Sequence, residues 1–200
     1  MSEVIKIANC SGFYGDNLSI AKKMVEGGPI DVLTGDYLAE LTMTILYNQK
    51  MKRGENLGYV GTFLKQFRDV AKLCNDQNIK IVSNAGGLNP ASMAAEVENI
   101  IKELNLDLKV AYIDGDDLMP RLDELSSSGE KLKNIDKNND LFSYEKKPLT
   151  ANAYLGAWGI KEALDNGADV VICPRVTDAA VVIGPAAWKF NWSRNDYDQL

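Results

Sequence analysis

Short apolar segments alternate with amphipathic, helix-like segments along most of this 200-residue chain. Each apolar segment is only a few residues long and is closed by turn residues, which is typical of a buried strand. Strands that alternate with helices build a parallel sheet with helices on its faces, because each parallel connection needs a crossover. The sequence therefore predicts an α/β fold with a mainly parallel sheet flanked by helices. We expect its strands at Val4–Ala8, Ile30–Leu33, Ile79–Val82, Leu108–Ile113 and Val170–Cys173.

The net charge and the lack of sorting patterns limit the kinds of partner and the cell compartment that we expect for this chain. The formal net charge is −6 at pH 7 and there is no long Lys/Arg cluster, which argues against nucleic acid and anionic membrane surfaces. The first residues lack the pattern of a signal peptide, and no segment approaches the roughly 20 apolar residues of a membrane span. We therefore expect a cytoplasmic protein that binds a small molecule, and a homo-oligomer stays open.

The residue types limit the chemistry. The chain contains no histidine, which removes imidazole bases and the usual zinc sites. Its three cysteines are far apart, which indicates free thiols in a reducing compartment, and Cys10 is expected to be a small core residue. Catalysis would therefore depend on carboxylates, other polar groups or an oxygen-ligated metal.

Polar and acidic turns follow all five predicted strands. Parallel strands deliver their carboxyl ends to one edge of the sheet, where ligands bind in open α/β folds. We therefore expect the residues that follow the strands to surround one cleft, although they span most of the chain. They are Asp16, Asp36, Asn84, Gly86, Gly87, Asp116, Asp117, Arg175 and Asp178.

The turn from Asn84 to Pro90 lies between a predicted strand and a helix start. Its glycines, Gly86 and Gly87, let the backbone approach a ligand, and amides at a helix start favour an anion. Asn84 and Asn89 would add polar contacts to the same ligand. An ordinary tight turn is the alternative, and the spacing is not that of a dinucleotide fingerprint.

The charged residues near the ends of the last two predicted strands suggest two further roles. Asp116 and Asp117 could perform acid–base work or hold Mg²⁺, or they could simply cap the following helix. Arg175 could bind a carboxylate with two hydrogen bonds, or it could pair with Asp178. Mg²⁺ is therefore one candidate cofactor, and no further cofactor is indicated.

Two segments fall outside this pattern. Residues 126–147 are polar and rich in serine, asparagine and lysine, which predicts a mobile surface insertion or a lid over the site. Trp188, Phe190 and Trp192 alternate near the end of the sequence. We expect them to be exposed in residues 1–200 and to pack on chain that follows, which would make this an incomplete domain.

Six groups of motifs occur in a recognisable order. They include Ser11–Asp16, Asp36–Met43, Asn84–Pro90, Gly115–Leu118, Asn152–Ala157 and Arg175–Asp178, with Gly184-Pro185 and Asn195–Leu200 after them. In these motifs the chain resembles the N-terminal part of the acyclic terpene utilisation family of the AtuA type. The resemblance covers nearly all of residues 1–200 as a single domain, apparently truncated at its C-terminal end.

The resemblance implies a role in the breakdown of citronellol- and geraniol-type terpenes, near an acyl-CoA carboxylase. The function expected from it is a catabolic enzyme that acts on a branched-chain carboxylate or acyl-CoA. Glu40, Asp116 or Asp117 would be its acid–base group. Asn84, Gly86, Gly87, Asn89, Arg175, Asp178 and Asp36 would bind the substrate. The alternative is a non-catalytic ligand-binding or scaffold subunit that accompanies the carboxylase.

Overall fold

The structure is a computed structural model that describes residues 4–200. Within these residues, five strands form one sheet in the order β1-β2-β3-β5-β4, and every pairing is parallel. The predicted fold class is confirmed. The strands are β1 (Ile7–Asn9), β2 (Val32–Gly35), β3 (Lys80–Ser83), β4 (Val110–Tyr112) and β5 (Val170–Ile172).

The strand boundaries differ from the predicted ones by a few residues. β1 begins at Ile7 rather than Val4, because pairing with β2 starts where Ile7 meets Val32. The chain before it still follows the sheet, since the backbone oxygen of Lys6 accepts hydrogen bonds from Asp31 and Val32. β4 is shorter than predicted because Leu108 and Lys109 precede its pairing with β5.

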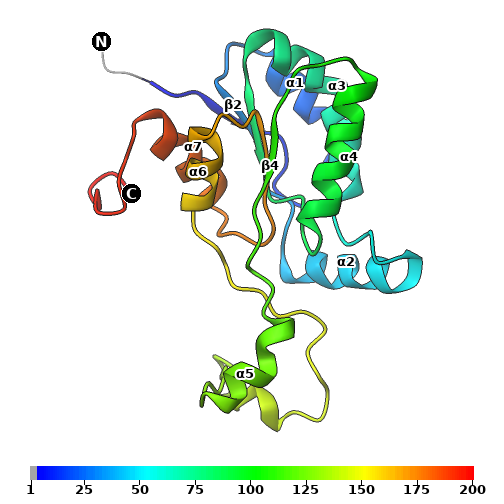
Figure 1. The fold of residues 1–200 in the computed structure, drawn as a ribbon, viewed down its shortest axis with the longest axis vertical. Coiled ribbons are helices and arrows are strands. Elements are labelled where there is room, and N and C mark those ends of the chain that lie inside the picture. The colour runs from blue at the N-terminus through cyan, green and yellow to red at the C-terminus, as the bar shows by residue number, and fades with distance from the viewer. Residues whose placement is uncertain (1–3) are drawn as a thin grey trace.

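Two helical layers cover the sheet, one on each face (Figure 1). The helices α1 (Ile20–Glu26), α3 (Gly61–Gln77) and α4 (Pro90–Glu103) share the larger core. The helices α6 (Trp158–Asp165) and α7 (Ala180–Lys189) pack on each other and enclose the second core. α3 shows why these segments are helical: Phe63, Phe67, Val70 and Cys74 recur at helical spacing and are all buried.

A projecting lobe and a further helix stand at the carboxyl edge of the sheet. α2 (Glu40–Arg53) follows β2 and crosses this edge (Figure 1). The lobe, residues 117–152, follows β4 and contains η1 (Met119–Arg121), α5 (Leu122–Ser127) and η2 (Leu141–Ser143). An isolated β-bridge between Asp117 and Asn152 closes its base. The predicted insertion, residues 126–147, lies in this lobe and is mostly exposed.

The topology places a switch point between β3 and β5. After β3 the chain turns to α4 in one helical layer, and after β5 it turns to α7 in the other. Since β3 and β5 are neighbours, the loops that follow them diverge to opposite faces. Such a switch point is where ligands bind in open parallel sheets. The turns that carry Asn84 and Arg175 flank this position.

The aromatic residues after α7 are less exposed than predicted. Trp188, Phe190 and Trp192 are each half-buried. Trp188 packs against the second core, and the rings of Phe190 and Trp192 stack with their centroids 5.5 Å apart. The expectation of exposed aromatic faces was therefore wrong, because these side chains cover one another and the end of α7.

Candidate active site

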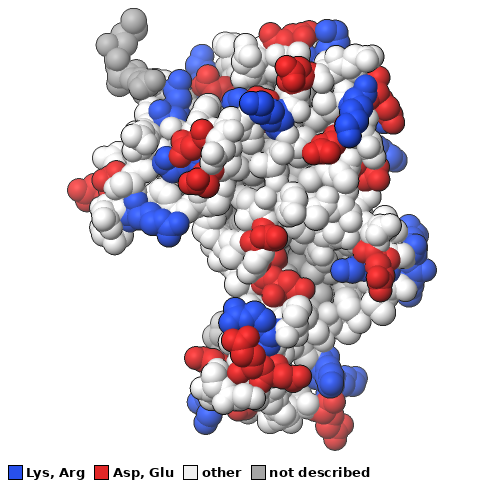
Figure 2. Space-filling view, viewed as in Figure 1, with Lys and Arg blue, Asp and Glu red and all other residues white. Residues whose placement is uncertain are grey.

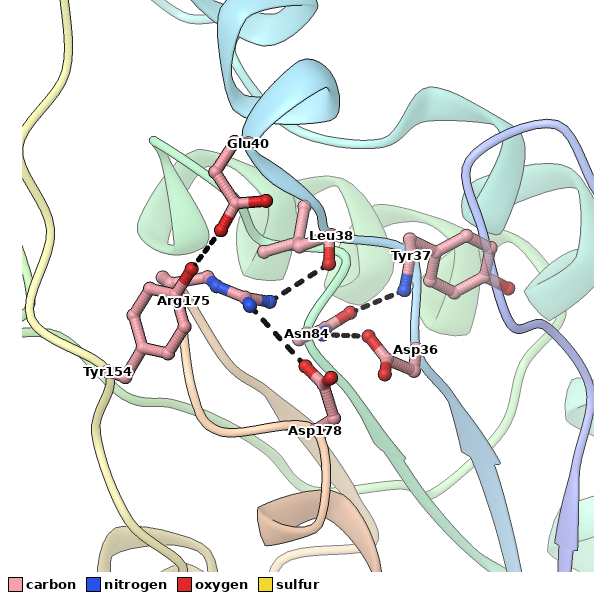
Figure 3. A network of polar contacts seen from close by, with 8 residues as sticks. All are labelled: Asp36, Tyr37, Leu38, Glu40, Asn84, Tyr154, Arg175 and Asp178. Carbon is pink, nitrogen blue, oxygen red and sulfur yellow. Dashed lines mark hydrogen bonds and ion pairs between the residues drawn. The ribbon is translucent and has the colours of Figure 1, made fainter. Parts of the chain in front are cut away.

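Arg175 is the centre of the site. It follows β5, and its side chain is only 6% exposed. Its Nη1 donates a hydrogen bond to the backbone oxygen of Leu38 over 2.9 Å, and its Nη2 lies 3.4 Å from Oδ1 of Asp178 (Figure 3). The predicted pairing with Asp178 is thus present, but Asp178 is largely exposed and the contact is long. An anion could therefore compete with Asp178 for the guanidinium.

Asp36 and Asn84 lie beside Arg175 at the switch point. The side-chain nitrogen of Asn84 donates to Oδ1 of Asp36 over 2.5 Å, and its oxygen accepts from the backbone N–H of Tyr37 over 2.8 Å (Figure 3). Burial raises the pKa of Asp36; the hydrogen bond from Asn84 and the charge of Arg175 oppose this rise, while the charge of Asp178 adds to it. This carboxyl is therefore a weaker acid than a free aspartic acid.

Asp116 joins the base of the lobe to the Arg175 turn. Its Oδ2 accepts from the side-chain nitrogen of Asn152 over 2.8 Å and from the backbone N–H of Arg175 over 3.2 Å. Burial raises the pKa of Asp116, and these hydrogen bonds oppose the rise. Asp116 is 5% exposed and does not line the cavity described next, so it positions Arg175 rather than facing a ligand.

A cavity of about 440 Å³ opens in front of Arg175, between the start of α2 and the lobe. Met43, Pro148 and Leu149 give it an apolar wall, while Glu40, Asn152 and Tyr154 are among its polar groups. The hydroxyl of Tyr154 donates a short hydrogen bond to Glu40, and its ring centroid lies 4.0 Å from the Arg175 Cζ (Figure 3). The hydrogen bond from Tyr154 is the main cause of the lowered pKa of Glu40, which therefore stays ionised at neutral pH.

The glycine turn, by contrast, is used for packing. Its amides donate within the protein: Gly86 to Cys173, Gly87 to Asn84, Leu88 to Gly58 and Asn89 to Gly86. Gly86 and Gly87 are buried, so these amides are not directed at a ligand. The structure thus favours the tight-turn alternative over anion binding by Gly86 and Gly87.

Three other predicted residues also serve local structure. Asn89 caps α4 by accepting from Ser92, and its nitrogen donates to the backbone oxygens of Glu55 and Leu57. Asp117 accepts from the backbone N–H of Met119, as expected of a cap. Asp16 accepts from the N–H of Gly12. The structure therefore brings together Asp36, Asn84, Asp116, Arg175 and Asp178, with Glu40 beside them.

The carboxylates near the switch point do not form a metal-binding group. In the part of the chain that the structure describes, no three His, Cys, Asp or Glu side chains come together as metal ligands. Each of Asp16, Asp36, Asp116 and Asp117 accepts a hydrogen bond from its own donor, and Asp178 faces Arg175. These contacts reduce the repulsion that close carboxylates would otherwise exert on one another. A Mg²⁺ ion bound by fewer protein ligands stays a prediction.

Two other features of the molecule lack the character of a functional site. A hollow of about 570 Å³ lies beside β4 at the opposite, amino-terminal edge of the sheet, but Lys102, one of its charged residues, pairs with Glu98. The three cysteines are buried free thiols, and burial raises the pKa of each, so none is suited to act as a thiolate. The predicted core position of Cys10 is confirmed by its 2% exposure.

Comparison with known families assigns the chain. A sequence model of the acyclic terpene utilisation family protein AtuA matches residues 5–200. The chain belongs to the AtuA family. No curated protein and no solved structure matches it significantly. Within residues 4–200 of this AtuA family member, no helix is both long and apolar enough to cross a bilayer.

Sequence reasoning missed three groups of this AtuA family site. Tyr154, Asn152 and the backbone oxygen of Leu38 all contact the Arg175 turn or its carboxylate partners. Tyr154 and Asn152 lie in the motif Asn152–Ala157, which had been recognised only as part of the family pattern. That motif was the signal that could have identified them. Figure 2 shows acidic side chains at the waist between the lobe and the body of the molecule.

Proposed function

We propose that the protein binds a branched-chain carboxylate, or its CoA thioester, in the cavity in front of Arg175 and acts on it during acyclic terpene degradation. The family assignment supports the metabolic context. The chemistry of the cavity supports the choice of ligand. We propose Arg175 as the group that anchors the carboxylate or the thioester carbonyl.

The observation that carries this proposal is a buried guanidinium at the switch point, beside an apolar wall. A planar guanidinium has five N–H groups in a fixed array, which suits a carboxylate. Met43 on the α2 side and Pro148 and Leu149 on the lobe side offer an apolar lining, where a hydrocarbon chain can be shielded from water. A ligand with one anionic end and one branched apolar end satisfies both the guanidinium and the apolar lining.

Glu40 is the acid–base candidate that best fits the cavity. Of the three residues predicted for this role, Asp116 is occupied in positioning and Asp117 caps the lobe, while Glu40 lines the cavity. Because its pKa is lowered, Glu40 is ionised at neutral pH and can accept a proton but not donate one. Loss of the hydrogen bond from Tyr154, the main cause of the lowering, would make it a stronger base. Arg175 would stabilise negative charge on the reacting carbonyl or carboxylate. Abstraction of a proton next to that carbonyl is the reaction class that these two groups can support.

A non-catalytic subunit is the second candidate. Three apolar or aromatic side chains of the lobe are exposed: Ile135 is 99% exposed, Phe142 41% and Tyr144 43%. Exposed apolar groups on a projecting segment are typical of a protein contact. On this alternative the cavity holds the ligand while the lobe docks on an enzyme such as an acyl-CoA carboxylase.

Binding and turnover measurements separate the two candidates. The protein would be titrated with straight-chain and methyl-branched carboxylates and their CoA thioesters, and each mixture would be assayed for product. Tight binding of a branched ligand with turnover that is lost in Glu40→Gln supports the enzyme. Binding without turnover supports the subunit. Equal, weak affinity for every compound, unchanged in Arg175→Met, contradicts both.

A further inference from the structure

Tyr154 has a backbone held in place by its neighbours and a side chain that is half exposed to solvent. The neighbouring amides hold the backbone: Ala153 donates to the oxygen of Asp116 over 2.7 Å, and Leu155 donates to that of Arg175 over 3.2 Å. Tyr154 itself is 50% exposed. Exposed side chains change rotamer within picoseconds to nanoseconds when no contact holds them. The position of this ring is therefore decided by its contacts.

The Tyr154 side chain has two such contacts, and they come from two other elements. The hydroxyl donates to Glu40, the first residue of α2, which lies 114 positions away in the sequence. The ring lies over the guanidinium of Arg175, after β5. In Figure 3 the ring stands beside Arg175 with its hydroxyl directed at the Glu40 carboxylate. Tyr154 thus covers the proposed anchor and occupies the proposed base at the same time.

We propose that Tyr154 is a cover over Arg175, held shut by its hydrogen bond to Glu40. The structure shows the closed state. In the open state the ring rotates into solvent, more of the guanidinium is exposed to the cavity that Arg175 already lines, and the Glu40 carboxylate is released for a ligand. The role of the cover in ligand binding rests on the proposed function. The closed and open states themselves are properties of the ligand-free protein.

The free-energy difference between the closed and open states is expected to be small. A hydrogen bond to a charged group at an exposed position contributes modestly, because water competes for both partners. A cation–π contact at a partly exposed site adds a similarly small amount. A ligand whose carboxylate binds Arg175 better than the Tyr154 ring does would therefore shift the population toward the open state.

Arginine modification by phenylglyoxal tests the cover without any ligand. The rate at which Arg175 reacts would be measured by peptide mass spectrometry in the wild type, Tyr154→Phe, Tyr154→Ala and Glu40→Gln. The exposed Arg53 is the internal reference in every sample. Tyr144→Phe is the matched control, because Tyr144 is an exposed tyrosine of the lobe that does not line this cavity.

We expect Arg175 to react about two- to tenfold faster in Tyr154→Phe than in the wild type, the factor that corresponds to one such hydrogen bond. Tyr154→Ala should react faster still, because the ring is gone, and Tyr144→Phe should match the wild type. Equal rates for Arg175 in the wild type, Tyr154→Phe and Tyr154→Ala, relative to Arg53, would overturn the cover.

A second arm separates failure of the cover from failure of the proposed function. The same rates would be measured with a saturating branched carboxylate. Protection of Arg175 in all variants, with no effect of Tyr154 on the ligand-free rate, retains the anchor and rejects the cover. Faster reaction in Tyr154→Phe with no protection by any carboxylate retains the cover and rejects the proposed ligand.

Discussion

The Oδ2 atom of Asp116 accepts a hydrogen bond from the backbone N–H of Arg175 over 3.2 Å, although 59 positions separate the two residues. The same oxygen also accepts from Asn152. One buried carboxylate therefore joins the end of β4, the base of the lobe and the turn that presents the guanidinium. The oxygen of Arg175 accepts from the N–H of Leu155, which follows the lobe, while its N–H donates to Asp116, which precedes the lobe. The two bonds hold the Arg175 turn against both ends of the lobe.

Replacing Asp116 with alanine should destabilise the protein by about 1–3 kcal/mol, because the buried N–H of Arg175 and the part-buried side-chain nitrogen of Asn152 would lose their acceptor. Ligand affinity should fall as well, since the Arg175 turn would be less well positioned. Urea unfolding and ligand titration measure the two effects. Asp117→Ala is the matched control: it removes an exposed cap and should cost about 1 kcal/mol while leaving affinity unchanged. Equal loss of affinity in both variants would contradict the positioning role of Asp116.

Arg175→Lys should weaken binding of a carboxylate ligand by about tenfold or more, although the positive charge is kept. An ammonium cannot reproduce the planar array that reaches Leu38 and Asp178 while lying beneath the ring of Tyr154. Calorimetric titration of the wild type and the variant gives the ratio of dissociation constants. Full affinity in the lysine variant would show that Arg175 contributes charge alone.

Gly86→Ala should destabilise the protein by about 1–3 kcal/mol through overpacking. A Cβ at this position would lie 2.6 Å from the backbone oxygen of Cys173 and 2.9 Å from the Cα of Pro90, and neither atom can move freely. Gly61→Ala is the control, because a Cβ there meets nothing within 4 Å. It should be neutral or slightly stabilising. Thermal unfolding compares the two, and a harmless Gly86→Ala would reopen a ligand-binding role for the turn.

The fold and the general position of the site could be predicted because both depend on local patterns. Apolar segments closed by Gly and Asp turns identified the strands, and parallel topology then brought Asp36, Asn84 and Arg175 to one edge. The roles of individual groups could not be predicted. The amides of the glycine turn suit an anion in isolation, but the oxygens of Cys173 and Gly58 reach Gly86 and Leu88 first. The contact of Tyr154 with Glu40 spans 114 positions, and no local pattern encodes it.

Magnesium should leave the melting temperature unchanged relative to a sodium chloride control of equal ionic strength. The reason is that the carboxylates near the switch point already have donors, as Asp36 has Asn84 and Asp116 has Asn152. Differential scanning fluorimetry measures this directly. A rise with Mg²⁺ that disappears in Asp36→Asn would instead establish a metal at Asp36, as the sequence suggested.

The pH dependence of stability should differ in sign between Asp36 and Glu40. The pKa of Asp36 is raised in the folded protein, so the native state holds this proton more tightly than the unfolded chain does. Its contribution to stability is complete below the unfolded value of 3.8 and is lost as the pH rises through the folded pKa. The pKa of Glu40 is lowered, so its contribution is complete above the unfolded value of 4.5 and is lost as the pH falls through the folded pKa.

Urea unfolding of the wild type, Asp36→Asn and Tyr154→Phe would separate the contributions of Asp36 and Glu40. The measurements would run from about pH 3 to about pH 7, a range that includes the pKa values of both carboxyls in the unfolded chain. Relative to the wild type, Asp36→Asn should gain stability as the pH rises above about 4, because the cost of ionising a half-buried carboxyl is removed. Tyr154→Phe should show its largest deficit near neutral pH and approach the wild type in acid, because its lost partner is the ionised Glu40. Parallel curves for all three proteins would mean that neither carboxyl is perturbed by the contacts around the switch point.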